Sequence, residues 1–171
     1  FFAEVALNTQ LAAAAGALFA MLAVWLKTRS LDVGMAGNGA IAGLVAITAP
    51  SGYVEFWAAP IIGAVGGIVA VLGILAIEKY LDDPVGALSA HGLAGIWGTL
   101  SVGIFGSARL ILPGASPGVW YGITDGDLGA SLGQLGVQAV GVAAAFTLVF
   151  VLSYATFGIL KTTIGIRVSE E

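Results

Sequence analysis

His91 is the only histidine in the 171-residue sequence, and it lies in an otherwise uncharged segment from Ala87 to Phe105. Ionisable side chains are costly in a lipid-thick apolar segment, and they usually face a pore or the interior of a helix bundle. A neutral imidazole can accept or donate a hydrogen bond and hand on a proton, so one such ring in an apolar duct could admit a small weak base while the duct rejects hydrated metal cations. The alternative is a structural ring bonded to a neighbouring carbonyl or hydroxyl group.

The residues just before His91 predict where its helix begins. Asp83 can accept hydrogen bonds from the unpaired amide groups of a helix start, and Pro84 suits the first helical position. We therefore expect Asp82 and Asp83 to form a cap and a solvated cytoplasmic turn, with His91 about two helical turns further on. Because the sequence has no second histidine and no cysteine to complete a ligand set, we expect neither a metal nor a cofactor.

The composition indicates an integral membrane protein. Hydrophobic residues make up 58% of the chain and charged residues 9%, with a mean hydropathy of +1.01, and a soluble domain could not cover itself with so little polar surface. The net charge of -4 is confined to connections and ends, so it does not indicate nucleic-acid binding. The chain starts with Phe1 and lacks a charged signal-peptide region, and we expect it to be a piece of a longer protein.

Five apolar stretches predict an all-α, polytopic bundle of five transmembrane helices, at residues 9–26, 33–49, 57–77, 85–107 and 128–160. The alternation of a barrel strand is absent. The last stretch exceeds one span, so it should be tilted, bent or extended beyond the bilayer. Small residues four apart, such as Gly39 and Gly43 or Gly129 and Gly133, are expected at close helix contacts.

Lysine and arginine predict the orientation, because they concentrate in short cytoplasmic connections. Most of them follow the first, third and fifth stretches: Lys27, Arg29, Lys79, Lys161 and Arg167. Arg109 alone lies on the other side. The sequence therefore predicts an outer N-terminus and a cytoplasmic C-terminus.

Three motifs resemble the ammonium transporter family, the Amt/Mep/Rh proteins. They are "DDPVGALSAHGLAGIWGTLSVGIF" at residues 82–105, "GNGAIAGLVAITA" at residues 37–49 and the terminal "GIRVSEE". The resemblance runs from about Asn8 to Glu171, and the histidine-bearing motif is highly specific. It implies that residues 1–171 form a partial ammonium transporter domain, equivalent to the last five of eleven membrane helices in the cell membrane.

The resemblance also implies a mechanism and partners. Each subunit of a homotrimer would hold a narrow apolar pore in which two histidines share a hydrogen bond, and His91 matches the second of them. Ammonium would be recruited outside and lose its proton, and ammonia and the proton would pass separately. Thr48 would lie near the pore, although its hydroxyl is about as well suited to bonding within its own helix. A cytoplasmic PII-type protein is the implied regulator.

Several family features belong to earlier helices that this chain does not contain, including the first pore histidine and the outer recruitment site. We expect the subunit-coupling tail to continue beyond Glu171. A second hypothesis is an ammonium-sensing membrane module linked to a signalling domain. A membrane-embedded enzyme using His91 as a general base is less well supported, because no carboxylate, serine pair or metal cluster accompanies the ring within the spans. A stabilising structural subunit is the remaining alternative.

Overall fold

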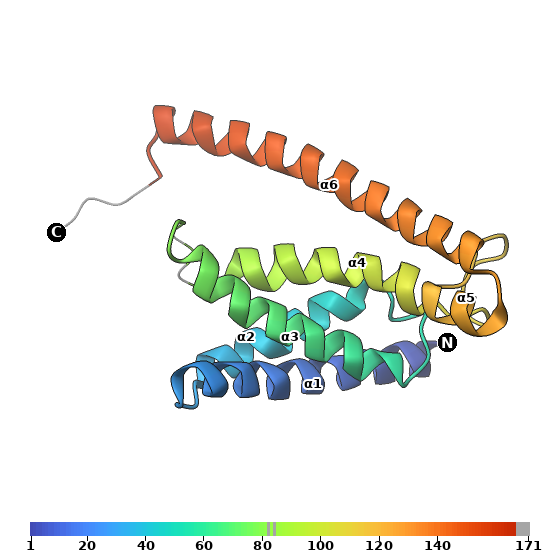
Figure 1. Cartoon of the computed structure of the whole chain (residues 1–171). Coiled ribbons are helices and arrows are strands. Elements are labelled where there is room, and N and C mark those ends of the chain that lie inside the picture. Colours follow the sequence, from blue (N-terminus) through green and yellow to red (C-terminus); the bar gives the residue numbers. More distant parts are fainter. Residues whose placement is uncertain (82, 84, 167–171) are drawn as a thin grey trace.

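The computed structural model of the chain describes residues 1–81, 83 and 85–166. In this part, helices form the whole architecture apart from one isolated bridge between Val54 and Gly106. The elements in order are α1 (Phe2–Thr28), α2 (Val33–Thr48), α3 (Ala58–Ile77), the π-helical turn η1 (Leu88–Leu93) that continues into α4 (Ala94–Phe105), α5 (Val119–Asp125) and α6 (Leu128–Thr163) (Figure 1). The all-α prediction is confirmed.

The five predicted stretches are all helical, with some differences in extent. By length and apolar composition, four described helices could cross a membrane: α1, α3, η1 together with α4, and α6. The apolar α2 has 16 residues, so it is only about 24 Å long. α1 begins seven residues before the expected start at Thr9, and the histidine-bearing helix begins at Leu88 instead of Val85. The seven-residue α5 was not predicted.

Successive long helices run in alternating directions, so α6 ends at the opposite end of the bundle from the start of α1 (Figure 1). Lys27 lies in the last turn of α1 and Lys161 in the last turn of α6, while Lys79 follows α3. These cations therefore share one end of the bundle. Which end faces the cytoplasm stays a prediction.

Glycines let α1, α2 and α3 pack with their backbones almost in contact. A Cβ atom added to Gly63 would overlap the backbone of Ala12, and one added to Gly67 would overlap the backbone of Gly16. Gly43 approaches Ala12 in the same way. Such close approach gives van der Waals contact, which holds helices together where lipid is as apolar as the side chains. The predicted role of the four-residue glycine spacing is thus seen in these helices.

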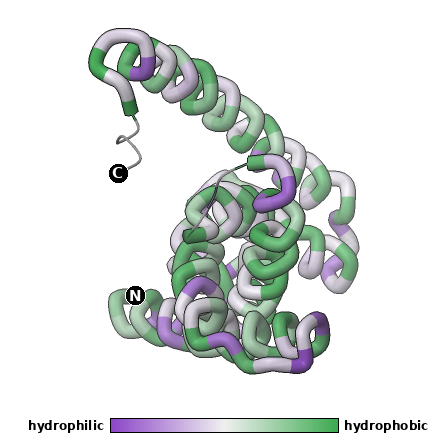
Figure 2. The backbone as a smooth tube through the Cα atoms, turned by 90° about the vertical axis from the view of Figure 1, so that its left-hand side faces the viewer, coloured by the Kyte–Doolittle hydropathy of each residue, from purple (hydrophilic) through white to green (hydrophobic). Residues whose placement is uncertain are grey.

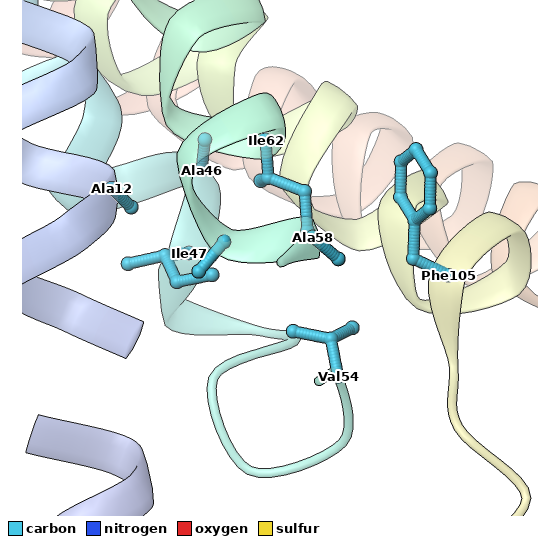
Figure 3. Packing of buried hydrophobic residues seen from close by; sticks show 8 residues of the cluster. Ala12, Ala46, Ile47, Val54, Ala58, Ile62 and Phe105 are labelled. Carbon is cyan, nitrogen blue, oxygen red and sulfur yellow. The ribbon is translucent and has the colours of Figure 1, made fainter. Parts of the chain in front are cut away.

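The largest buried cluster fills one end of this block. It joins α1, α2, α3 and α4 with the connection that carries Val54, and its members are Ala12, Ala46, Ile47, Val54, Ala58, Ala59, Ile62 and Phe105 (Figure 3). Trp97 packs against the cluster and donates its indole N–H to the carbonyl of Ile62, at 3.0 Å. The start of α4 is therefore fixed against α3.

The 36-residue α6 stands apart from the other long helices, as the end-on view shows (Figure 2). Ser131, in its first turn, is its only buried residue. A Cβ atom added to Gly133 would meet nothing within 4 Å, and at Gly129 the nearest atom is the carboxylate of Asp127 at 4.0 Å. For these two glycines the expected close helix contact is not found among the described residues.

An ionic cluster connects three segments at the end of the bundle where α1 begins. Arg109 binds Glu55 with two hydrogen bonds of 3.1 and 3.0 Å, and it reaches Glu4 of α1 at 3.1 Å. The hydroxyl of Ser107, which is almost fully buried, donates to Glu55 at 2.7 Å. The cluster therefore holds together α1 and the connections that follow α2 and α4.

The hydrogen bonds from Arg109, and secondly the one from Ser107, lower the pKa of Glu55 below its ordinary value of 4.5. A carboxyl group whose pKa is lowered on folding stabilises the fold above its unfolded-state pKa, and this contribution is lost as the pH falls through the lower folded-state value. We expect Glu55→Gln to lower the melting temperature at pH 7, and the difference from wild type to shrink as the pH falls below about 4.5. Thermal unfolding in detergent over pH 3 to 7 measures this difference.

The matched control is Glu78→Gln at the opposite end of the bundle, because Glu78 forms no ion pair within the described part of the chain. Its melting temperature should stay near that of wild type across the range. A Glu55→Gln difference that stays constant down to the lowest pH would contradict this account of the cluster.

Candidate functional site

An apolar groove lies between the histidine-bearing helix and α6. It has a volume of about 400 Å³. One wall is formed by residues of η1 and α4, and the other by the apolar side chains Val142, Ala145, Phe146 and Val149 of α6. His91 and the hydroxyl of Thr99 are the polar side chains in the lining. The groove is thus an apolar surface that carries one imidazole.

His91 is solvent-accessible in this chain, and one of its ring nitrogens is engaged. The Nδ1 atom lies 3.2 Å from the carbonyl oxygen of Ala87, one turn earlier. Because a carbonyl oxygen only accepts, this hydrogen bond requires the hydrogen on Nδ1. In the neutral ring, the second nitrogen, Nε2, is then the acceptor. The hydrogen bond expected of a structural histidine is therefore present at Nδ1. It leaves Nε2 as an acceptor on a side chain that lines the groove.

The backbone around His91 departs from a regular α-helix. Residues 88–93 form a π-helical turn, and the amide of Ala94 donates to the carbonyl of Ser89, five residues before it. π-helical turns are rare and often occur at functional sites. The carboxylate of Asp83 accepts a hydrogen bond from the amide of Leu88, with Oδ2 at 3.1 Å. Asp83 is therefore bonded to the first residue of the turn that carries His91.

Of the other predicted site residues, Asp83 bonds to the turn that carries His91, whereas Thr48 does not reach the groove. Thr48, at the end of α2, donates its hydroxyl to the carbonyl of Leu44 at 2.7 Å, and it does not line the groove. Asp82 and Pro84 lie outside the described residues. Among the residues that are described, no three His, Cys, Asp or Glu side chains are grouped so that they could hold a metal ion.

Two features near the turn were not anticipated from the sequence. Ser89 is fully buried, and its hydroxyl lacks a hydrogen-bond partner within the described part of the chain. Gly86, three residues earlier, has a left-handed φ of 66°. The glycine was visible in the motif, but only the packing of α3 shows why these small residues are needed there.

The fold and the groove define a polytopic helical membrane protein with a histidine-containing apolar site. The sequence matches the Ammonium Transporter Family over residues 2–171. The chain belongs to that family. It is 44% identical to the ammonium transporter Amt2 of Archaeoglobus fulgidus over 98% of this chain and 35% of the relative. It is 35% identical to the ammonium transporter of Bacillus subtilis over 96% of this chain and 39% of the relative.

Solved structures agree with this assignment. A structure described as "Sensor Amt Protein" superimposes with a TM-score of 0.80 at 34% identity, over 98% of this chain and 38% of that one. Candida albicans Mep2 gives a TM-score of 0.71 at 27% identity, over 98% of this chain and 36% of Mep2. The chain thus spans less than two fifths of the length of these relatives. The curated relatives are described as transporters, not enzymes.

The bond between Asp83 and Leu88 leads to a prediction about the π-helical turn. Replacing Asp83 by Ala removes the acceptor, whereas Asp83→Asn keeps an oxygen at the same place. Loss of a capping acceptor typically costs about 1 kcal/mol. We expect hydrogen–deuterium exchange of residues 88–93 to be faster in Asp83→Ala and close to wild type in Asp83→Asn. Equal exchange in all three proteins would show that the carboxylate does not hold this turn.

Proposed function

We propose that this chain is part of an ammonium transporter and that His91 lines the path of the transported species. One observation carries the proposal: the single histidine lies on the wall of an apolar groove with Nδ1 bonded to its own helix. The acceptor Nε2 is then suited to a small hydrogen-bond donor such as ammonium or ammonia. Membership of the ammonium transporter family supports the choice of this substrate.

The apolar lining favours deprotonation before passage. An intact ammonium ion would lose its hydration in the groove with little to replace it, because the walls offer one imidazole and one hydroxyl. Burying an unpaired cation is far more costly than burying a neutral amine. Ammonia and the proton are therefore proposed to pass separately, with the imidazole as a hydrogen-bonding and proton-accepting group. To enclose this groove as a pore, further walls would have to come from residues outside this chain.

The remaining site residues have supporting roles in this proposal. Asp83, together with Asp82 and Pro84, sets the start of the histidine-bearing helix, and Thr48 contributes a hydroxyl near the path. By resemblance to the family, we infer a homotrimer in the cell membrane and a PII-type regulator on the cytoplasmic face. The exposed apolar surface of α6 supports burial against lipid or further protein.

An ammonium-sensing module is the second candidate. It is favoured by the good superposition on the structure described as "Sensor Amt Protein". The segment after the membrane helices of the full-length protein distinguishes the two functions, because a sensor should continue into a soluble signalling domain. Uptake assays add a second criterion, since a transporter must move substrate across the membrane at a rate that a sensor does not need.

Replacing His91 by Ala in the full-length protein tests the proposal. We expect the rate of methylammonium uptake into proteoliposomes to fall by about tenfold or more, or its selectivity over potassium to change, because a positioned proton-transfer group is lost. Trimer assembly, measured as the mass of the purified protein in detergent, should not change. Thr147→Ala is the control, because this hydroxyl of α6 bonds to the carbonyl of Ala143 and does not line the groove. Wild-type uptake and selectivity in His91→Ala would defeat the assignment.

A further inference from the structure

α3 makes a close contact with the π-helical turn that carries His91. Gly73 and Ser89 are both buried. A Cβ atom added to Gly73 would lie 2.8 Å from the hydroxyl oxygen of Ser89, 3.0 Å from its Cβ and 2.6 Å from Cδ1 of Leu93. The missing side chain of Gly73 is thus a notch that admits Ser89, with Leu93 at its edge.

Ser89 enters the notch from the side of the turn opposite His91, whereas Leu93 contacts the notch and also lines the groove. Residues two positions apart in a helix of this kind point to roughly opposite faces. Their exposure agrees, because Ser89 is fully buried whereas His91 is accessible and lines the groove. A displacement of Ser89 away from α3 would therefore push the His91 side of the turn toward α6.

The contact is steric, because the hydroxyl of Ser89 finds no hydrogen-bond partner among the described residues. Leu93 meets the notch with the tip of a flexible side chain, which could move aside. Ser89 fills the notch with its Cβ and Oγ atoms, which cannot swing away as a longer side chain can. A larger residue at position 73 must therefore displace the backbone of Ser89. The size of residue 73 is therefore coupled through Ser89 to the backbone that carries His91.

A second contact fixes the start of the same turn. A Cβ atom added to Gly86 would overlap Cδ1 of Ile74 and lie 3.4 Å from the side-chain nitrogen Nδ2 of Asn38. The carbonyl of Gly86 accepts a 2.8 Å hydrogen bond from Ala90. The positive φ of Gly86, at 66°, is a conformation that side chains disfavour. Gly73 and Ile74 are adjacent, so one turn of α3 contacts both Ser89 and Gly86.

We propose that Gly73 and Ser89 are positioning residues that set the orientation of His91 toward the permeation groove. They act through packing and do not touch the transported species. This inference rests on the proposed transport function. It adds that the geometry of the histidine, and with it the selectivity of the path, depends on the size of one residue in the neighbouring helix.

The test is Gly73→Ala in the full-length protein, reconstituted in proteoliposomes. We expect methylammonium uptake per folded protein to fall by about tenfold, because small displacements of a positioned group have large effects on rate. The ratio of methylammonium to potassium flux should also change. A purely structural defect would reduce the amount of folded protein and leave that ratio intact. The double variant Gly73→Ala/Ser89→Gly removes the Ser89 side chain that the new Cβ atom would meet. It should restore most of the methylammonium uptake rate and of the methylammonium-to-potassium flux ratio.

Gly66→Ala is the matched control within α3. Its added Cβ atom would lie 2.9 Å from Cβ of Ala46 and 3.0 Å from the carbonyl oxygen of Ala42, so it is similarly crowded but faces α2. We expect less folded protein and an unchanged flux ratio. If Gly73→Ala cannot be purified, Ser89→Thr crowds the same notch from the other side and should give the same change in ratio.

The outcomes separate the two proposals. Wild-type rate and ratio in Gly73→Ala or Ser89→Thr, together with a defect in His91→Ala, would overturn only the positioning role. A double variant that recovers no more than Gly73→Ala alone would also overturn it. If His91→Ala itself transports like wild type, the proposed function fails, whatever the glycine variants show.

Discussion

The close backbone approach of α1, α2 and α3 is the constraint on which the rest of the structure depends. In lipid, burying apolar side chains gives little drive for helices to associate, so dense packing must supply it. Gly16, Gly43, Gly63 and Gly67 let the three backbones meet. Gly98 then seats α4 against the carbonyl of Ala46 in the same manner. The histidine-bearing helix is thus held by a block that has little freedom to rearrange.

The groove begins where this mode of packing ends. Gly103 of α4 still meets Leu135 near the start of α6. Further along α6, Cβ atoms added to Gly136, Gly141 and Gly158 would meet nothing within 4 Å. α6 therefore contacts α4 near one end of the bundle and diverges from it further along (Figure 1). His91 belongs to the rigid wall of the resulting space, and Phe146 and Val149 belong to the divergent wall.

The parts of the structure that could be predicted from the sequence are those set by local pattern. The apolar stretches indicated the helices, and the fact that His91 is the only histidine singled out a residue that lines the apolar groove. The cluster of Glu4, Glu55 and Arg109 was not predicted, because it joins residues about 50 to 100 positions apart. The glycine spacing did not distinguish Gly63 from Gly133, since both look alike in sequence and only the neighbouring helix decides whether contact occurs. α5 was missed because seven residues are too few for a clear periodicity.

The π-helical turn meets two requirements at once: it redirects the side chain of His91, and it keeps the backbone hydrogen-bonded. A segment in lipid must satisfy its own backbone hydrogen bonds, so a side chain cannot be redirected by breaking the helix. A π-helical turn redirects it by widening one turn while amides still bond to carbonyls, as Ala94 does to Ser89. Asp83 adds a bond at the first amide of the turn, and the ring of His91 bonds to Ala87. The imidazole is thereby brought to the groove without leaving the helix, and the packing of Ser89 against Gly73 supplies the contact that holds the widened turn in place.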